Sequence, residues 1–291
     1  MTPKRPCLLA IHAHPDDESS KGAGTMALYA AQGVRVVLVC ATDGAEGEIL
    51  NPRMDQPGIQ DRMVELREAE LKTACDLLGV EEIYMLGYRD SGMPGSDANK
   101  HPQSFARATE DDAVGKLVEI IRKERPEVIL SYDESRGYDH PDHVKVHEYG
   151  TRAFHEAGDP EKFPDKGPAW KPLKLYYFAT FTKKRFQKLN EAAVAAGNEP
   201  PFAGWLENWD TMGFAEPDVT AQVNVAEYIE LRSKALLAHA TQIDPDSFWF
   251  VIPDEMQREV YPWEDYTLVS AHTEIEDLED NLFAGIPLID Q

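Results

Sequence analysis

Short apolar segments alternate with longer amphipathic segments through the first 180 residues, and this alternation restricts the fold more than any other feature. The apolar runs have the length of buried strands, and the segments between them have the apolar spacing of helices. Expected strands lie at residues 7–11, 34–41, 82–86, 128–132 and 173–181, and expected helices at 23–32, 61–78, 111–124 and 143–157. Strands that alternate with helices pair in parallel and are covered by helices on both faces. The sequence therefore predicts an α/β fold with a Rossmann-like, mostly parallel sheet flanked by helices.

The charge balance disfavours two classes of partner. The chain has 29 basic and 52 acidic residues and a formal net charge of −23. Such a field repels phosphate backbones and anionic lipids, so we expect neither nucleic acid nor a membrane surface as a partner. The three cysteines, Cys7, Cys40 and Cys75, form no CxxC pair, which fits a reducing cytosol. The sequence begins without a signal-peptide pattern, and no segment is long enough to span a bilayer, so a cytoplasmic location is expected.

Two dense clusters of ionisable side chains each follow a predicted strand. The first strand leads into HAHPDDE at residues 12–18, and the strand at 128–132 is followed by GYDHPDH at residues 137–143. Loops that follow neighbouring parallel strands meet at one edge of the sheet, where ligands bind in such folds. Either cluster alone is typical of a helix cap or a surface turn. Because both follow predicted parallel strands, we expect them to converge on one functional site.

The two clusters contain the side chains that a hydrolytic metal site requires. Two imidazoles and one carboxylate, with positions open for water and substrate, form a typical catalytic zinc site. Zinc lowers the pKa of a bound water to about 7, so that hydroxide is available at neutral pH. A carboxylate beside the metal can accept the proton of the water, and a second imidazole can stabilise the oxyanion or protonate the leaving amine. We expect one Zn²⁺ per chain, with Fe²⁺ as the alternative because the same ligands suit iron(II).

A glycine-rich segment offers a competing interpretation. GAGTMA at residues 22–27 matches the dinucleotide-binding fingerprint, and Asp43 has about the spacing of its ribose-binding acid. However, the fingerprint should follow the first strand directly, whereas the charged segment HAHPDDESSK intervenes here. Close packing between helix and sheet explains the small residues better, so a dinucleotide-binding oxidoreductase is only a distant alternative.

With both clusters in view, the chain resembles the superfamily of zinc de-N-acetylases that act on N-acetylglucosaminyl-inositol compounds. The HPDD motif at residues 14–17 and the HPDH motif at residues 140–143 carry this resemblance. Over nearly the full length, the chain is most similar to the branch of mycothiol S-conjugate amidases. The stretches that support this branch occur in family order: HAHPDDESSKG, GEILNP, RDSGMPG, GYDHPDH, KLYY, HATQIDP and LFAGI.

The resemblance implies roles for residues of both clusters. The implied metal ligands are His14, Asp17 and His143. The implied catalytic groups are Asp16 as general base, His140 as electrostatic or acid partner, Asp142 as the residue that orients His140, and Tyr138 as a group that helps bind the oxyanion.

The resemblance also points to residues that contact the substrate. Arg67 and Asp90 match positions that hold sugar or inositol hydroxyls, and Glu46 is a weaker candidate. Lys21 marks the amidase branch and is expected to contact polar groups of the substrate, and His239 is expected to line the pocket. Each has an ordinary alternative: a solvated helix residue for Arg67, a turn residue for Asp90, a polar loop for Glu46, an exposed lysine for Lys21 and a structural histidine for His239.

The implied reaction is hydrolysis of the amide between glucosamine and the acylated cysteine of a mycothiol S-conjugate, a small molecule. The products would be a mercapturic acid and glucosaminyl-inositol, which makes the reaction a detoxification step. Deacetylation of N-acetylglucosaminyl-inositol in mycothiol biosynthesis is the nearer alternative. We expect residues 1–182 to form the metal-binding α/β core. Residues 183–291 are expected to complete that core and cap the site, within one structural unit; their acidic stretch 274–280 is expected to be a solvated face.

Overall fold

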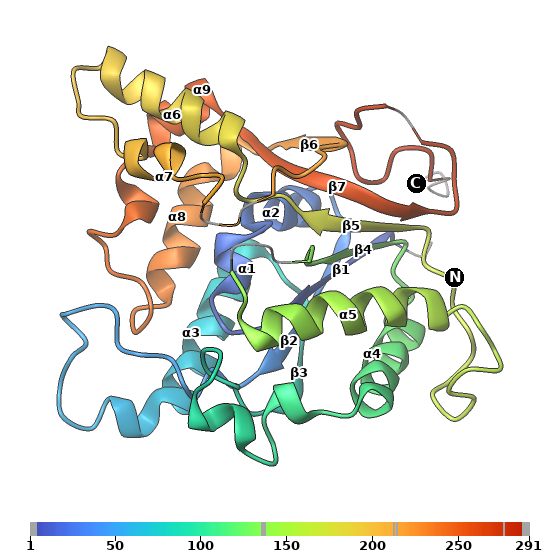
Figure 1. Cartoon of the computed structure of the whole chain (residues 1–291). Helices are drawn as coiled ribbons and strands as arrows, with labels where there is room; N and C mark the ends of the chain where they lie inside the picture. Colours follow the sequence, from blue (N-terminus) through green and yellow to red (C-terminus); the bar gives the residue numbers. More distant parts are fainter. Residues whose placement is uncertain (1–4, 135–137, 212, 214, 276, 287–291) are drawn as a thin grey trace.

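A computed structural model describes residues 5–134, 138–211, 213, 215–275 and 277–286, so Gly137 of the second cluster lies outside the described residues. The described strands form one sheet in the order β3-β2-β1-β4-β5-β7-β6 (Figure 1). Their bounds are β1 Cys7–His12, β2 Arg35–Thr42, β3 Glu82–Tyr88, β4 Val128–Ser131, β5 Lys174–Phe178, β6 Ala221–Asn224 and β7 Trp263–Ala271. Strands β1 to β5 pair in parallel, and β7 pairs antiparallel with both β5 and β6.

The central strands are apolar along their whole length because both faces of the sheet are covered. Every residue of β1 is buried, as is every residue of β2 after Arg35. A continuous apolar run, rather than alternation of apolar and polar residues, is what a strand covered on both faces requires. These observations confirm the predicted α/β fold with a mostly parallel sheet.

Helices cover the two faces in two groups (Figure 1). One group consists of α2 (Ala23–Ala31), α3 (Met63–Leu78) and α8 (Ile229–Ala238), which contact one another, and the other consists of α4 (Glu110–Glu124) and α5 (Pro141–Glu156). The order of the strands explains this split, because right-handed crossovers on the two sides of β1 place their helices on opposite faces. Among the described residues, no helix has both the length and the apolar character that crossing a bilayer requires.

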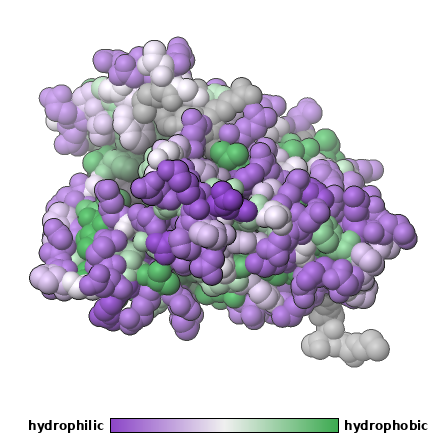
Figure 2. All heavy atoms as spheres, turned by 60° about the horizontal axis from the view of Figure 1, so that its bottom comes forward, coloured by the Kyte–Doolittle hydropathy of each residue, from purple (hydrophilic) through white to green (hydrophobic). Residues whose placement is uncertain are grey.

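Shorter helices complete the structure. A second apolar cluster, separate from the main core, lies among α6 (Lys183–Ala195), α7 (Ala203–Glu207) and α9 (Asp254–Val260). The remaining helical segments are α1 Asp17–Ser20, η1 Gln60–Arg62, η2 Asp97–Lys100, η3 Phe105–Arg107, η4 Ala226–Tyr228 and η5 Phe248–Phe250. One face of the molecule is mainly hydrophilic with small apolar patches (Figure 2), in keeping with the 28% of charged residues.

The glycine-rich segment at residues 22–27 begins helix α2 and packs against the sheet. A Cβ atom on Gly24 would lie 2.7 Å from the Cβ of Val225, so only glycine permits this approach. The backbone N–H groups of Gly24 and Thr25 donate to the carboxylate of Glu264, at 3.0 and 2.9 Å. A protein carboxylate thus lies where a dinucleotide would place its pyrophosphate. Packing of the helix against the sheet therefore accounts for the small residues, in agreement with the interpretation that the sequence favoured.

The sequence did not predict strand β7 or helix α6. The apolar residues of β7, in the sequence WEDYTLVSA, are interrupted by charged ones, so no clear strand period is visible. Its backbone nevertheless pairs with β5 on one side and β6 on the other. Pairing between distant segments, rather than local pattern, determines this strand.

One part of the acidic stretch 274–280 is not a solvated face. Glu279 is buried, its Oε1 accepts a hydrogen bond from Lys174 Nζ at 2.5 Å, and its Oε2 accepts one from the hydroxyl of Tyr176. The density of acidic residues suggested exposure, and for Glu279 that expectation was wrong. The fully buried ammonium of Lys174 in β5 requires a counter-charge, and Glu279 supplies it.

We expect Lys174→Met to lower the free energy of unfolding by about 3 kcal/mol, because removal of one partner leaves the other charge buried and unpaired. Urea denaturation measures this change. The double variant Lys174→Met/Glu279→Gln should be more stable than Lys174→Met alone, since it leaves no buried charge. As a control, Lys72→Met removes a lysine whose pair with Asp76 is exposed to solvent and should leave the midpoint nearly unchanged. Equal effects of Lys174→Met and Lys72→Met would contradict the prediction.

Candidate metal centre

The loop after β1 and the first turn of α5 meet at the carboxyl edge of the sheet. His14 lies in that loop, Asp17 begins helix α1 directly after it, and His143 comes from the first turn of α5. Their ligand atoms all lie within 4.8 Å of one another, and the three residues are 4 to 7% exposed. The structure thus brings together the three residues that the sequence suggested as metal ligands. They converge because β1 and β4 are adjacent parallel strands.

The spacing of these three side chains suits a tetrahedral ion. Asp17 Oδ2 lies 3.4 Å from His14 Nδ1 and 3.4 Å from His143 Nε2. Zinc bonds of about 2.0–2.1 Å in tetrahedral geometry place neighbouring ligand atoms about 3.3–3.4 Å apart. Burial lowers the pKa of His143 to about 4, so its imidazole is neutral at pH 7, as a metal ligand must be. The donor set therefore fits zinc.

Lys21 contacts the carboxylate of Asp17. Its Nζ lies 2.5 Å from Asp17 Oδ1, the oxygen that does not face the two histidines. Burial opposes ionisation of Asp17, but Lys21 and then His143 outweigh it and hold its pKa well below the usual value. Lys21 also lines the cavity beside the site, with its side chain 17% exposed. It therefore keeps Asp17 ionised and remains within reach of a ligand.

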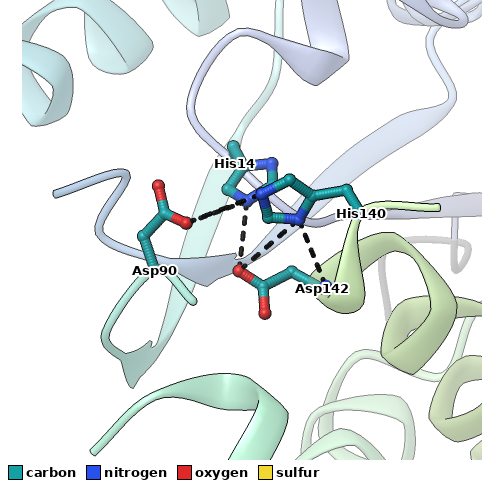
Figure 3. Close-up of side chains that lie close together, drawn as sticks. All are labelled: His14, Asp90, His140 and Asp142. Carbon is teal, nitrogen blue, oxygen red and sulfur yellow. Dashed lines mark hydrogen bonds and ion pairs between the residues drawn. The ribbon is translucent and has the colours of Figure 1, made fainter. Parts of the chain in front are cut away.

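A second group of side chains surrounds the other ring nitrogen of His14 (Figure 3). His14 Nε2 lies 3.2 Å from Asp142 Oδ2 and 3.5 Å from Asp90 Oδ1. The backbone N–H and the hydroxyl of Ser91 donate to the Asp142 carboxylate and hold it in place. An imidazole that binds a metal through one nitrogen commonly donates its other N–H to a carboxylate, which fixes the ring. His14 has this arrangement.

His140 meets Asp142 in a different way from the one expected. The Asp142 carboxylate lies 4.0 Å from His140 Nδ1, farther than it lies from His14. Instead, the backbone N–H of Asp142 donates to His140 Nδ1 at 3.2 Å. Nδ1 is therefore an acceptor, and the proton of the neutral ring is on Nε2. Burial, and then the neighbouring His14, lowers the pKa of His140, so the neutral form is favoured.

Negative charge accumulates around His14. Burial opposes charging of this imidazole, but hydrogen bonds to Asp142, Asp17 and Asp90 outweigh burial and raise its pKa well above the usual value. Three carboxylates around one buried ring create a strongly negative potential. That potential favours a divalent cation at the same place.

Asp16 is held in a strained conformation next to the ligands. Its φ of 130° is one that residues other than glycine rarely adopt. Its backbone N–H donates to Glu18 Oε2 at 3.0 Å, and its Oδ2 accepts from Arg67 Nη2 at 2.8 Å. Burial raises the pKa of Asp16, and the charge of Arg67 offsets part of that rise. A carboxylate with a raised pKa beside a metal site is suited to accept a proton.

Arg67 is buried and not a solvated helix residue. It is 2% exposed and donates to the backbone oxygens of Gly44 at 2.9 Å and Pro15 at 2.5 Å, as well as to Asp16. A Cβ on Gly44 would lie 2.5 Å from the guanidinium carbon, so glycine makes room for this side chain. The contacts of Arg67 in the structure therefore position Asp16 and its loop.

The other suggested substrate contacts are distributed differently. Asp90 lies beside His14 and accepts the N–H of Gly92 at 2.8 Å. Glu46 pairs with Arg89, and its backbone N–H donates to Asp90 Oδ2 at 3.3 Å. Asp90 thus lies at the site, and Glu46 contacts Asp90 through its backbone N–H.

His239 is fully buried beneath the loop after β1. Its Nε2 lies 2.6 Å from Glu18 Oε1, and both side chains are inaccessible to solvent. The sequence analysis did not assign a role to Glu18, yet this residue joins His239 to the backbone of Asp16. Its place in the HAHPDDE segment was the available signal, but spacing alone does not show which carboxylate points inward.

A cavity of about 460 Å³ opens from the metal centre. Asp16, Asp17, Lys21 and His143 line it at the polar end. Tyr138 also lines it, is 48% exposed, and places its ring 4.9 Å from the ring of His143. Its phenol group is therefore available to a ligand at this end.

The chain matches a known family and has close relatives. The profile of the PIG-L family, described as GlcNAc-PI de-N-acetylase, matches residues 9–154, which include both ligand loops. A mycothiol S-conjugate amidase from Streptomyces coelicolor is 45% identical over 284 residues, covering 96% of this chain and 97% of that protein. A 1D-myo-inositol 2-acetamido-2-deoxy-alpha-D-glucopyranoside deacetylase from Geodermatophilus obscurus is 41% identical over 296 residues, covering 99% of this chain and 100% of that protein.

Solved structures share the fold. N,N'-diacetylchitobiose deacetylase from Pyrococcus horikoshii superposes with a TM-score of 0.62 at 20% identity, covering 90% of this chain and 83% of that one. A 4-carboxy-2-hydroxymuconate hydratase from Pseudomonas putida also gives 0.62, at 18% identity, covering 93% and 99%. Because a deacetylase and a hydratase match equally well, this likeness shows the fold alone. The family profile and the sequence relatives carry the assignment, and by them the chain belongs to the PIG-L family of GlcNAc-PI de-N-acetylases.

Proposed function

We propose that the chain is a zinc-dependent amidase that cleaves the amide between glucosamine and the N-acylated cysteine of mycothiol S-conjugates. The observation that carries this proposal is the 45% identity, over 96% of the chain, to a mycothiol S-conjugate amidase. The products are a mercapturic acid and glucosaminyl-inositol, so the reaction serves detoxification. The substrate is a small molecule, and a cytoplasmic location, supported by the small and odd number of three cysteines, is part of the proposal.

His14, Asp17 and His143 would hold the ion, which we propose to be zinc in preference to iron(II). When bound, zinc supplies a hydroxide at neutral pH and a positive charge for the oxyanion. Asp16 accepts the proton of the attacking water at a carboxylate oxygen. Arg67 holds that carboxylate in position through the hydrogen bond to Oδ2. Asp142 fixes the ring of His14 through Nε2.

The remaining groups act on the carbonyl and on the leaving amine. The Nε2–H of neutral His140 is a donor that can stabilise the oxyanion. The proton that Asp16 takes from the attacking water can then pass to the glucosamine nitrogen as the amide bond breaks. The phenol of Tyr138, which lines the cavity, is a second donor for the oxyanion. The backbone N–H of Asp142 sets the tautomer of His140. In this scheme, Asp142 orients His140 through its backbone and His14 through its carboxylate.

For the residues proposed to contact substrate, the structure supports direct and indirect roles. Lys21 lines the cavity and Asp90 lies beside His14, so we propose that both meet polar groups of the substrate. We propose that Glu46, Arg67 and His239 act indirectly. They position Asp90 and the loop that carries Asp16. In the proposed organisation, residues 1–182 supply the metal centre, and residues 183–291 complete the sheet and cap the cavity.

Deacetylation of N-acetylglucosaminyl-inositol is the second candidate, favoured by the 41% identity to the deacetylase over 99% of the chain. Both substrates should be assayed side by side on one preparation whose metal content is measured. We expect kcat/KM to be higher for a mycothiol S-conjugate than for N-acetylglucosaminyl-inositol. The reverse order would assign the chain to the deacetylase activity.

A further inference from the structure

The lining of the cavity at the metal centre is of two kinds. Besides the ionisable residues of the metal centre, it consists largely of aromatic and aliphatic side chains. Four of its aromatic residues form one group: Phe181, Trp205, Phe248 and Trp249. We refer to these four residues as the aromatic wall.

The rings of the aromatic wall are in mutual contact. The ring centroids of Phe248 lie 4.3 Å from Trp249 and 5.2 Å from Trp205. Phe181 closes the group, at 6.2 Å from Trp205 and 6.3 Å from Trp249. These separations are those of packed aromatic pairs. The wall is therefore one continuous surface and not a set of isolated side chains.

Three separate segments build this wall. Phe181 follows β5, Trp205 lies in α7, and Phe248 and Trp249 belong to η5. All of them lie outside residues 9–154, the part that matches the family profile. The metal centre thus lies within the family match, whereas the aromatic wall comes from the part of the chain beyond it.

The aromatic wall is partly open to solvent. Phe248 is 38% exposed, and the other three rings are half-buried. Apolar surface that faces water beside a polar centre is unfavourable unless a ligand covers it. The volume of about 460 Å³ is that of a small-molecule site and far exceeds what an acetyl group fills. The cavity therefore has room for the sugar and, beside the rings, for an apolar group larger than acetyl.

We propose that the aromatic wall is the subsite for the sulfur substituent of the substrate and selects aromatic or large apolar substituents over small ones. This inference rests on the proposed amidase function. The sugar and inositol carry hydroxyl groups, which lose hydrogen bonds with water when they enter an apolar pocket. A thioether substituent needs no such partner. The acyl side of the amide therefore faces the rings, and the sugar side faces polar residues.

The test compares S-benzyl and S-methyl conjugates of mycothiol in steady-state kinetics. For the wild-type protein we expect kcat/KM to be about tenfold higher for the S-benzyl conjugate, as burial of one ring predicts. Phe248→Ala should remove most of this preference, lowering kcat/KM for S-benzyl severalfold and leaving S-methyl within about twofold. Phe250→Ala is the matched control, because Phe250 lies in the same helical turn but is not among the residues lining the cavity. It should leave both values nearly unchanged.

A second measurement needs neither a variant nor cleavage of a conjugate. S-benzyl-N-acetylcysteine and S-methyl-N-acetylcysteine are compared as inhibitors of N-acetylglucosaminyl-inositol hydrolysis by the wild-type protein. We expect the benzyl compound to inhibit about tenfold more strongly. Equal inhibition overturns the subsite, as does a loss in Phe248→Ala that is the same for every substrate, which would place the sugar on the rings. If no conjugate is cleaved but the benzyl compound still inhibits selectively, the amidase function fails and the aromatic subsite stands.

Discussion

His143→Ala should abolish both stoichiometric metal binding and turnover. The substitution removes one of the two imidazoles that face Asp17 Oδ2 at 3.4 Å, and the remaining pair of ligands cannot complete the site. A bound ion supplies several kcal/mol of transition-state stabilisation, so kcat/KM should fall by more than about a thousandfold. Metal analysis of the purified variant and of the wild type, together with an amide-hydrolysis assay, measures both effects. Treating the wild type with a chelator should reproduce the loss, and added zinc should reverse it.

His147→Ala is the matched control for this experiment. His147 lies one turn later on α5, and its Nδ1 contacts the backbone oxygen of Tyr132 at 3.0 Å. It belongs to neither group of candidate ligands among the described residues. We expect this variant to retain its metal. If His143→Ala also kept one ion per chain, the ligand assignment would be wrong.

Asp16→Asn should lower kcat by about a thousandfold, in the range of general-base catalysis, while the metal stays bound. The amide keeps the shape of the carboxylate and can still accept a hydrogen bond from Arg67, but it cannot take a proton from water. The separation of the two effects is the informative result, because Asp16 lies next to the proposed ligand Asp17 in sequence. Single-turnover kinetics and metal content on the same sample measure it.

Asp139→Asn provides the comparison, since Asp139 is an exposed carboxylate in the neighbouring loop. It should leave both turnover and metal content close to those of the wild type. Near-normal turnover in Asp16→Asn would refute the general-base role. Loss of metal in that variant would instead make Asp16 a ligand or a support for one.

The surroundings of Asp16 explain how a strained loop is maintained. Arg67 holds its carboxylate, while Glu18, itself paired with His239, holds its backbone N–H. Each of these partners is almost fully buried, so water does not compete with them. A conformation that costs about 1–3 kcal/mol persists only where such contacts compensate for it. The loop therefore presents Asp16 and Asp17 in different directions although they are adjacent.

Much of the fold could be predicted from the sequence because its signals are local. Apolar runs and helical spacing located β1 to β5 and α2 to α5 to within a few residues. The sequence did not predict strand β7, whose charged residues hide a strand that pairs with β5. It also predicted solvent exposure for Glu279, which is buried as the partner of Lys174. In both cases, the deciding contact is with a segment far away along the chain.

The aromatic wall could not be predicted from the sequence for the same reason. Its rings come from segments near residues 181, 205 and 249, and each segment alone has the composition of an ordinary loop or core turn. Only the folded chain places them around one cavity beside the metal centre. The shape of that cavity limits which substituents of a substrate can fit. Specificity for the substrate could therefore not be derived from motif residues alone.

The sequence by itself determined the α/β architecture and the two loops that carry the candidate metal ligands, because periodicity is local and parallel strands deliver their following loops to one edge. Only the tertiary structure decided which partner each ionisable side chain meets. Asp142 turns its carboxylate to His14 and its backbone N–H to His140, and buried Arg67 contacts Asp16. The physical reason is burial: a charged or polar group removed from water must find a partner in three dimensions, and these partners are distant in sequence.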